Sequence, residues 1–203
     1  LPMLYVSHSL DELQQIADNI LVLSKGEIAN YGDIHQIIHQ LNYADTDTNN
    51  GSSQLIIHQQ TSLALPLKIN SNHPEENHGL NTLLLNDLQE IHFPAQLIKK
   101  NANNKKLITL KALNEPIKLR CFILASDISL CLEKTNNSSI VNHLHGVISK
   151  IDRTDNNVLI TINSSGQDFF ANISSYSLDK LALKVEQAIY MQFKASAVRT
   201  FIN

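Results

Sequence analysis

The sequence predicts a mainly β protein, in which small barrel-like modules follow a short α/β segment. From residue 54 onward, apolar residues recur at every second position in short runs, and turn-forming clusters separate the runs. Residues 1–42 differ, because apolar runs there alternate with helical spacing. The polar stretch 43–53 lies between the two parts and has the composition of a linker.

Composition excludes several classes of protein. The chain has 203 residues, a formal net charge of −3 and 43% hydrophobic residues, which is enough to bury a core. The charge, the 5% aromatic content and the lack of Trp argue against a nucleic-acid partner, an OB-like binder included. No apolar run approaches the roughly 18–20 residues of a membrane helix. Cys121 and Cys131 suit apolar thiols in a reducing compartment better than a redox pair.

The first 42 residues are expected to form a strand, a helix, a hairpin and a second helix. Met3–Val6 has the continuous apolar character of a buried parallel strand. Residues 20–23 and 27–31 predict a hairpin that turns at residues 25–26. The helix after residue 33 carries apolar residues on one face, at Ile34, Ile37, Ile38 and Leu41. Because Leu1 is not an initiator Met, we expect the chain to be a piece of a longer protein.

The remaining residues predict short strands and one helix. The strands are expected at 55–57, 63–69, 107–113, 119–124, 147–151, 158–162, 169–173 and 189–193. Ser175 or Ser177 is the expected N-cap of the helix, with Leu178, Leu181 and Ala182 facing inward.

An internal repeat divides this β region. Residues 123–128 can be laid over residues 193–198 with an offset of 70 residues, and in both copies an apolar strand runs into Ala-Ser-x-Ile/Val. Each copy closes a strand-rich block of similar size. The repeat therefore predicts two related β modules, at residues 54–133 and 138–203.

The N-terminal motifs carry a resemblance to a known family. The run Leu-Tyr-Val-Ser-His-Ser-Leu-Asp-Glu at residues 4–12 is followed by further matches at 17–18, 21–23, 25–28 and 31–32. This ordered run resembles the last part of the ATPase domain of ABC transporters. The resemblance makes His8 the family's switch histidine, which contacts the nucleotide γ-phosphate, and so the candidate catalytic residue.

Three later segments resemble the molybdate-binding Mop modules of TOBE type. They are residues 125–130 (Ala-Ser-Asp-Ile-Ser-Leu), residues 138–142 (Ser-Ser-Ile-Val-Asn) with 146–147, and residues 191–195 (Met-Gln-Phe-Lys-Ala). Together with the N-terminal run, their order is similar to the C-terminal portion of the ATP-binding subunit of a molybdate importer. The resemblance implies an OB-like β-barrel built from two Mop modules, preceded by an incomplete end of a P-loop ATPase domain at residues 1–42.

The chain lacks motifs that ATP hydrolysis requires. A phosphate-binding P-loop needs Gly-x-x-x-x-Gly-Lys-Ser/Thr. Gly26 and Gly32 are one residue too far apart for it, and Asp33 follows. The family's Walker B carboxylates and signature motif are absent too. Without them His8 has no phosphate or Mg²⁺ to act on, so the chain alone is expected to be inactive, and ATP and Mg²⁺ belong to a full-length parent.

The second module supplies candidate anion ligands. Molybdate is a tetrahedral dianion, which proteins hold with backbone N–H groups, hydroxyls and a cation. By the resemblance, the matching positions are Ser139, Asn142 and Lys194. The family commonly has Arg where this chain has Val141, which removes a charge-assisted contact worth roughly 1.5–3 kcal/mol. Either these residues bind molybdate or tungstate, or Ser139 and Asn142 only shape a turn and Lys194 is solvated.

Nine histidines raise the alternative of a metal site. His35 and His39 are spaced i, i+4 on a predicted helix, and His143 and His145 are spaced i, i+2 on a predicted strand. Neither pair has a Cys or a third His nearby in the sequence, and a structural zinc site needs four ligands. Exposed polar histidines are therefore the favoured interpretation, and no metal is predicted.

Three functions follow from these observations. In the first, the chain is the C-terminal regulatory part of a molybdate-import ATPase, which binds the oxyanion and mediates homodimerisation. Its partners would be a second copy and the permease subunit, at the cytoplasmic face of the inner membrane. In the second, it is a free-standing, molbindin-like oxyanion-binding or storage protein. In the third, it is a dimerisation module whose anion site is lost, which Val141 favours over the second.

Overall fold

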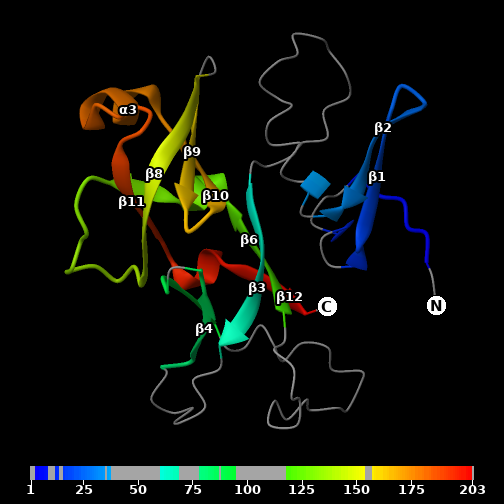
Figure 1. Ribbon diagram of the computed structural model, residues 1–203, viewed down its shortest axis with the longest axis horizontal. Helices are drawn as coiled ribbons and strands as arrows, with labels where there is room; N and C mark the ends of the chain where they lie inside the picture. The colour runs from blue at the N-terminus through cyan, green and yellow to red at the C-terminus, as the bar shows by residue number, and fades with distance from the viewer. Residues whose placement is uncertain are drawn as a thin grey trace.

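The protein is described here from a computed structural model, which covers residues 3–8, 12–13, 16–34, 36–37, 60–68, 78–86, 88–94, 118–153 and 157–202. Among these residues, the strands form one two-stranded hairpin and two five-stranded antiparallel sheets. Figure 1 shows the hairpin beside the two sheets. The predicted mainly β class is confirmed. The linker at 43–53, the strands expected at 55–57 and 107–113, and the helical pair His35 and His39 lie outside the described residues.

The predicted hairpin is present at the N-terminus. Strands β1 (Asn19–Ser24) and β2 (Glu27–Asp33) pair antiparallel, with Ser24 opposite Glu27. The connecting residues Lys25 and Gly26 both have positive φ, 53° and 84°, as the two-residue turns that match strand twist require. Helical backbone follows at residue 34, and Ile34 and Ile37 are buried as predicted.

The strand predicted at Met3–Val6 is wrong. These four residues have no strand conformation, and the side chains of Leu4 and Val6 are 94% and 87% exposed. No described strand pairs with them. A buried parallel strand needs hydrogen-bonded neighbours and a covering layer, and the apolar pattern alone supplies neither.

The two five-stranded sheets have the same internal order. The first sheet is β12-β6-β3-β4-β5 and the second is β7-β11-β8-β9-β10. Their members, in chain order, are β3 (Gln60–Lys68), β4 (Leu80–Leu84), β5 (Glu90–Pro94), β6 (Lys118–Leu124), β7 (Ser129–Cys131), β8 (Asn142–Arg153), β9 (Val158–Ser164), β10 (Gln167–Ile173), β11 (Ala188–Phe193) and β12 (Arg199–Ile202). The sequence did not predict β4, β5, β7 or β12, because all four have five or fewer residues and too little alternation to stand out.

The two modules exchange their last strands. Strand β6 leads through the 3₁₀ helix η3 (Ala125–Asp127) into β7, which pairs with β11 of the second module. Strand β11 leads through the 3₁₀ helix η4 (Ala195–Ala197) into β12, which pairs with β6 of the first module. The repeat seen in the sequence is this strand, 3₁₀ turn and crossing strand. In both copies the residue after the turn donates its N–H to the first alanine, Ala125 or Ala195.

One core fills the space between the two sheets. Its fully buried members include Leu83 and Phe93 from the first sheet and Ile160 and Phe193 from the second. Each fully buried side chain of this size contributes about 1.5–3 kcal/mol relative to an exposed one. The exchanged strands and the shared core join the two sequence modules into a single packed unit.

Helix α3 (Ser175–Leu181) is close to its predicted place. Its N-cap is Ser174 rather than Ser175 or Ser177, and the Ser174 hydroxyl accepts from the N–H of Ser177 at 3.1 Å. Leu178 is buried as expected. Ala182, which was expected to face inward, is exposed because it ends the helix in the left-handed conformation, with φ of 47°.

The N-terminal segment docks on the outer face of β6. A small apolar cluster joins Phe122 of β6 to Ile20, Ile34 and Ile37. Beside it, the guanidinium of Arg120, which is 7% exposed, donates to the carbonyl oxygen of Ala17 and to the carboxylate of Asp18. Arg120 and Phe122 are two residues apart on β6, so both point away from the main core and hold the α/β segment against the sheet.

Candidate functional site

The β8–β11 ladder brings the predicted anion-binding residues together. Phe193 pairs with Asn142, so Lys194 follows the end of β11 beside the residues that precede β8. Fifty-odd residues of sequence separate these positions, yet they meet at the same end of the sheet. The predicted residues Ser139, Asn142 and Lys194 therefore lie close together in the fold. A sequence comparison alone does not establish this proximity.

Asn142 has a structural role that its place in the motif did not reveal. It is fully buried, its Oδ1 accepts from the N–H of His92 at 2.6 Å, and its Nδ2 donates to the carbonyl of His92 at 3.0 Å. His92 belongs to β5 of the first sheet, so the Asn142 side chain joins the two sheets through both backbone groups of this residue.

Ser139 and Lys194 are exposed and have no ion-pair or side-chain hydrogen-bond partner in the described part of the chain. Ser138, one residue earlier, accepts the N–H of Ile140 on its hydroxyl at 3.1 Å and shapes the turn into β8. Lys194 is the N-cap residue of η4, and its carbonyl accepts from the N–H of Ala197 at 3.0 Å. A hydroxyl and an ammonium group thus remain available at this end of the sheet.

His8 lies on the N-terminal segment, exposed, in a bend. The nearby carboxylate of Glu12 accepts hydrogen bonds from the hydroxyls of Ser7 at 2.7 Å and Tyr5 at 3.1 Å. These bonds lower the pKa of Glu12, and the same contact with Glu12 raises the pKa of Tyr5. The sequence printed above contains no phosphate-binding loop to accompany His8.

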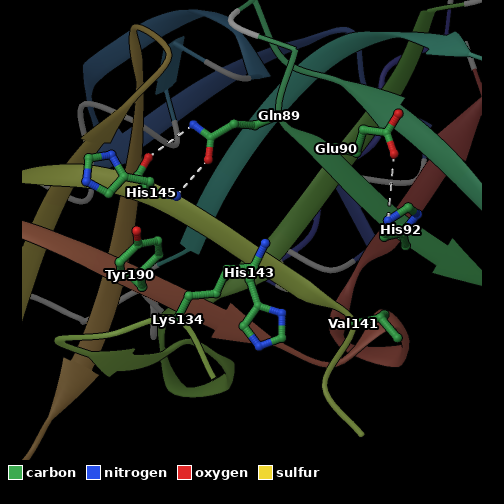
Figure 2. A pocket seen from close by; sticks show the side chains of 8 residues that line it. All are labelled: Gln89, Glu90, His92, Lys134, Val141, His143, His145 and Tyr190. Carbon is green, nitrogen blue, oxygen red and sulfur yellow. Dashed lines mark hydrogen bonds and ion pairs between the residues drawn. The ribbon is translucent and has the colours of Figure 1, made fainter. Parts of the chain in front are cut away.

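A cavity of about 420 Å³ opens beside the start of β8 (Figure 2). It is lined from β5 by Glu90 and His92, from β8 by His143 and His145, from β11 by Tyr190, and from the β7–β8 connection by Lys134. Gln89 and Val141 complete its wall. The spacing of His143 and His145 was noticed in the sequence. Their meeting with His92, Lys134 and Tyr190 was missed, because β5 is distant in sequence and was not predicted as a strand.

Gln89 fixes one side of this cavity. Its Oε1 accepts from the N–H of His145 at 2.6 Å, and its Nε2 donates to the His145 carbonyl and to the Ser164 hydroxyl, both at 3.1 Å. The ring of His145 packs edge-on against Tyr190, with centroids 5.1 Å apart. The side chain of Gln89, just before β5, and that of Asn142 on β8 therefore form two bridges between these parts of the chain, and the cavity lies beside them.

The described residues contain no group of three or more His, Cys, Asp or Glu side chains placed to hold a metal ion. In the same residues, no helix is long and apolar enough to cross a membrane. Both cysteines are free, and burial raises the pKa of the Cys121 thiol to about 12.

The fold and the sequence both match proteins of one class. Residues 138–200 match the family model of the TOBE domain. Among solved structures, the cytoplasmic molybdate-binding protein ModG, in a form with molybdate bound, matches with a TM-score of 0.50 and 14% identity, over 75% of this chain and 98% of that one. The predicted OB-like architecture of Mop and TOBE modules is confirmed at the level of the fold.

Curated relatives extend the match beyond the TOBE domain. The chain is 32% identical over 195 residues to the molybdenum import ATP-binding protein ModC of Haemophilus ducreyi, 31% identical over 199 residues to that of Shewanella sp. strain MR-4, and 28% identical over 203 residues to that of Escherichia coli K12. These matches cover 96–98% of this chain, which spans about half the length of the relatives. The predicted resemblance to the ATP-binding subunit of a molybdate importer is confirmed.

Proposed function

We propose that this chain is the regulatory part of a molybdate-import ATPase, and that its second β module binds the oxyanion. The observation that carries the proposal is the β8–β11 register, which sets Lys194 beside the segment of Ser139 and Val141. Lys194 and Ser139 offer a cation and a hydroxyl, the donors that a tetrahedral dianion requires. The similarity to ModC proteins over nearly the whole chain supports molybdate or tungstate as the anion.

The proposal includes an assembly. Two copies of the chain would associate through their β modules, and the N-terminal segment with His8 would complete an ATPase only with the P-loop of a longer parent. That parent would sit against a permease subunit at the cytoplasmic face of the inner membrane. The contact of Arg120 with Ala17 and Asp18 then gives the β modules a direct connection to the ATPase segment.

Calorimetric titration of the purified chain with molybdate at pH 8.0, with sulfate as the control anion, tests the binding role. We expect saturable molybdate binding that is much tighter than any sulfate binding at the same pH. Lys194→Ala should weaken it by about tenfold or more, because a charge-assisted contact is worth roughly 1.5–3 kcal/mol, and Ser139→Ala should weaken it less. Lys184→Ala, which removes an exposed lysine elsewhere, is the matched control and should leave the affinity unchanged.

Absence of any heat or thermal shift at millimolar molybdate would contradict the binding role. The β modules would then be a dimerisation platform without an anion site, the alternative that Val141, 43% exposed where the family commonly has Arg, favours. Light scattering of the same sample distinguishes the two parts of the proposal, since it reports the dimer whether or not molybdate binds.

A further inference from the structure

The cavity beside β8 collects basic side chains from separate parts of the chain. His92 comes from β5 of the first module, His143 and His145 from β8 of the second, and Lys134 from the connection between the modules. Figure 2 shows the three imidazoles on different sides of the cavity, with Lys134 extending toward the centre of the group. A volume of about 420 Å³ falls in the range of small-molecule sites.

We propose that this cavity is a second anion-binding site, selective for multiply charged oxyanions and strengthened as the pH falls below neutral. It goes beyond the proposed function, because it uses none of the candidate ligands Ser139, Asn142 and Lys194. Its cations are imidazoles, which as a class gain their charge between about pH 8 and pH 5.

The charges around the cavity decide the sign of this pH dependence. Apart from the imidazoles, the charged side chains that line the cavity are one cation, Lys134, and one carboxylate, Glu90. Glu90 Oε2 lies 3.9 Å from His92 Nε2. The negative charge of Glu90 therefore balances the positive charge of a protonated His92. Protonation of His143 and His145 then leaves a positive excess, which an oxyanion would neutralise.

The hydrogen bonds of His143 and His92 are compatible with the charged form. Thr135 donates its single hydroxyl hydrogen to Gln192 Oε1 at 3.0 Å, so its contact of 3.1 Å with His143 Nε2 requires that nitrogen to donate. The added proton would therefore go to Nδ1 of His143 without breaking this bond. Nδ1 of His92 lies 3.1 Å from the hydroxyl of Thr82, which can accept from it.

Tyr190 and Gln89 add polar atoms to the wall without adding charge. The ring of Tyr190 packs against His145, and Gln89 holds the backbone of that residue on both sides, through its N–H and its carbonyl. The imidazole of His145 is therefore positioned before any ligand enters. Since no group of three metal-ligating side chains is assembled in the described part of the chain, the basic cluster suits an anion better than a cation.

The test is a sulfate titration of the whole chain at pH 6.0 and pH 8.0, by calorimetry and by NMR of the imidazole signals. Sulfate is doubly charged across this range, so any pH dependence belongs to the protein. We expect binding about tenfold tighter at pH 6.0. His143→Gln combined with His145→Gln should abolish the difference between the two pH values, and His78→Asn, a substitution of an exposed histidine outside the cavity, should leave it intact.

Several outcomes would overturn the inference. Equal sulfate affinity at both pH values, or a pH dependence that survives in the double variant, would show that the cavity histidines do not act. Stoichiometric Zn²⁺ binding that the double variant abolishes would show a metal site instead.

Should the double variant fail to fold, Lys134→Met in the exposed connection replaces it and must weaken sulfate binding at pH 6.0. Lys194→Ala separates the two sites, because it should lower molybdate affinity at pH 8.0 without removing the acid-favoured sulfate binding.

Discussion

The N-terminal segment and the β sheets place apolar residues in opposite environments. In the segment, Leu4, Val6 and Leu23 are more than half exposed, although their pattern is that of buried strands. In the sheets, Phe93, Phe169 and Phe193 are at most 1% exposed. An apolar run is therefore buried only where a second layer exists to cover it, and the two exchanged β modules supply that layer for each other.

The contact between the two regions is narrow. It consists of the apolar cluster around Phe122 and the hydrogen bonds of Arg120, both on β6. We therefore expect the β sheets to unfold as one unit and the N-terminal segment to detach before them.

Two phenylalanines give the sharpest comparison, because Phe193 lies in the shared core and Phe122 lies on the outer face of β6. Phe193→Ala empties the shared core and should reduce the free energy of unfolding by about 3–5 kcal/mol. Phe122→Ala empties only the cluster with Ile20, Ile34 and Ile37. Its main effect should be loss of hydrogen-exchange protection in β1 and β2, with a much smaller change in the denaturation midpoint of the sheets. Equal effects of both substitutions on that midpoint would contradict two regions of different stability.

Gly146 tests how closely the strands of the second sheet pack. A Cβ at this position would lie 2.6 Å from Ile162 Cγ2 and 2.7 Å from the carbonyl oxygen of Asn163. Because the backbone oxygen cannot move aside, Gly146→Ala should cost about 1–3 kcal/mol of stability in urea denaturation. Gly79→Ala meets no atom within 4 Å but has φ of 75°, so it measures backbone strain without the clash. A neutral Gly146→Ala would show that β8 and β9 are not packed as described.

Asn142 tests the connection between the two sheets. Asn142→Leu removes the acceptor and the donor that satisfy the backbone of His92, and leaves both groups of β5 unpaired. We expect a loss of about 1–3 kcal/mol, together with faster amide exchange at His92. Asn163→Leu is the control, because its bond from Nδ2 to Asp168 lies at the surface. Wild-type stability of Asn142→Leu would mean that the amide serves only a ligand.

Arg120 tests the docking of the N-terminal segment. Asp18→Asn removes the charge that faces the buried guanidinium and should cost about 1 kcal/mol, a modest amount because the Asp18 side chain is 84% exposed. The loss should appear as faster exchange in β1 and β2, with the sheets unaffected. Asp179→Asn breaks the exposed pair with Arg153 at 4.0 Å and should have no measurable effect. Destabilisation of the sheets by Asp18→Asn would contradict local detachment.

The two thiols give the smallest effect on stability and a clear readout. Burial raises the pKa of the Cys121 thiol from 9.0 to about 12. Below pH 9 the thiol is neutral in both states and its burial contributes fully to the free energy of unfolding. That contribution to stability is lost as the pH rises from 9 toward 12. At pH 8 a thiol reagent should label half-exposed Cys131 slowly and Cys121 only after unfolding. Labelling of Cys121 as fast as Cys131 would show that the core opens easily.

The sequence predicted the features that depend on local pattern. The β1–β2 hairpin follows from its two-residue turn, and β8, β9, β10 and β11 follow from alternation. The repeat around Ala125 and Ala195 was visible as well. The exchange of β7 and β12 was not, because strands of three and four residues carry too little pattern, and because their partners are set by the other module. The failed strand at Met3–Val6 has the same cause, since burial depends on neighbours distant in the chain.

The candidate sites divide in the same way. Ser139, Asn142 and Lys194 were found through motif resemblance, and the β8–β11 register places them together. The sequence could not show that the Asn142 amide is occupied by the backbone of His92. The sequence also could not show the cavity of His92, His143 and His145, because His92 lies on β5, a strand that was not predicted. Spacing identified two of these histidines, and only the packing of β5 against β8 added the third.

The proposed oxyanion site lies at the end of the second sheet, between the residues preceding β8 and those following β11. Amide NMR during a molybdate titration at pH 8.0 would locate it. We predict saturable shifts centred on residues 138–142 and 194–196, and their loss in Lys194→Ala. An unchanged spectrum at millimolar molybdate, or shifts centred on residues away from these two segments, would contradict it.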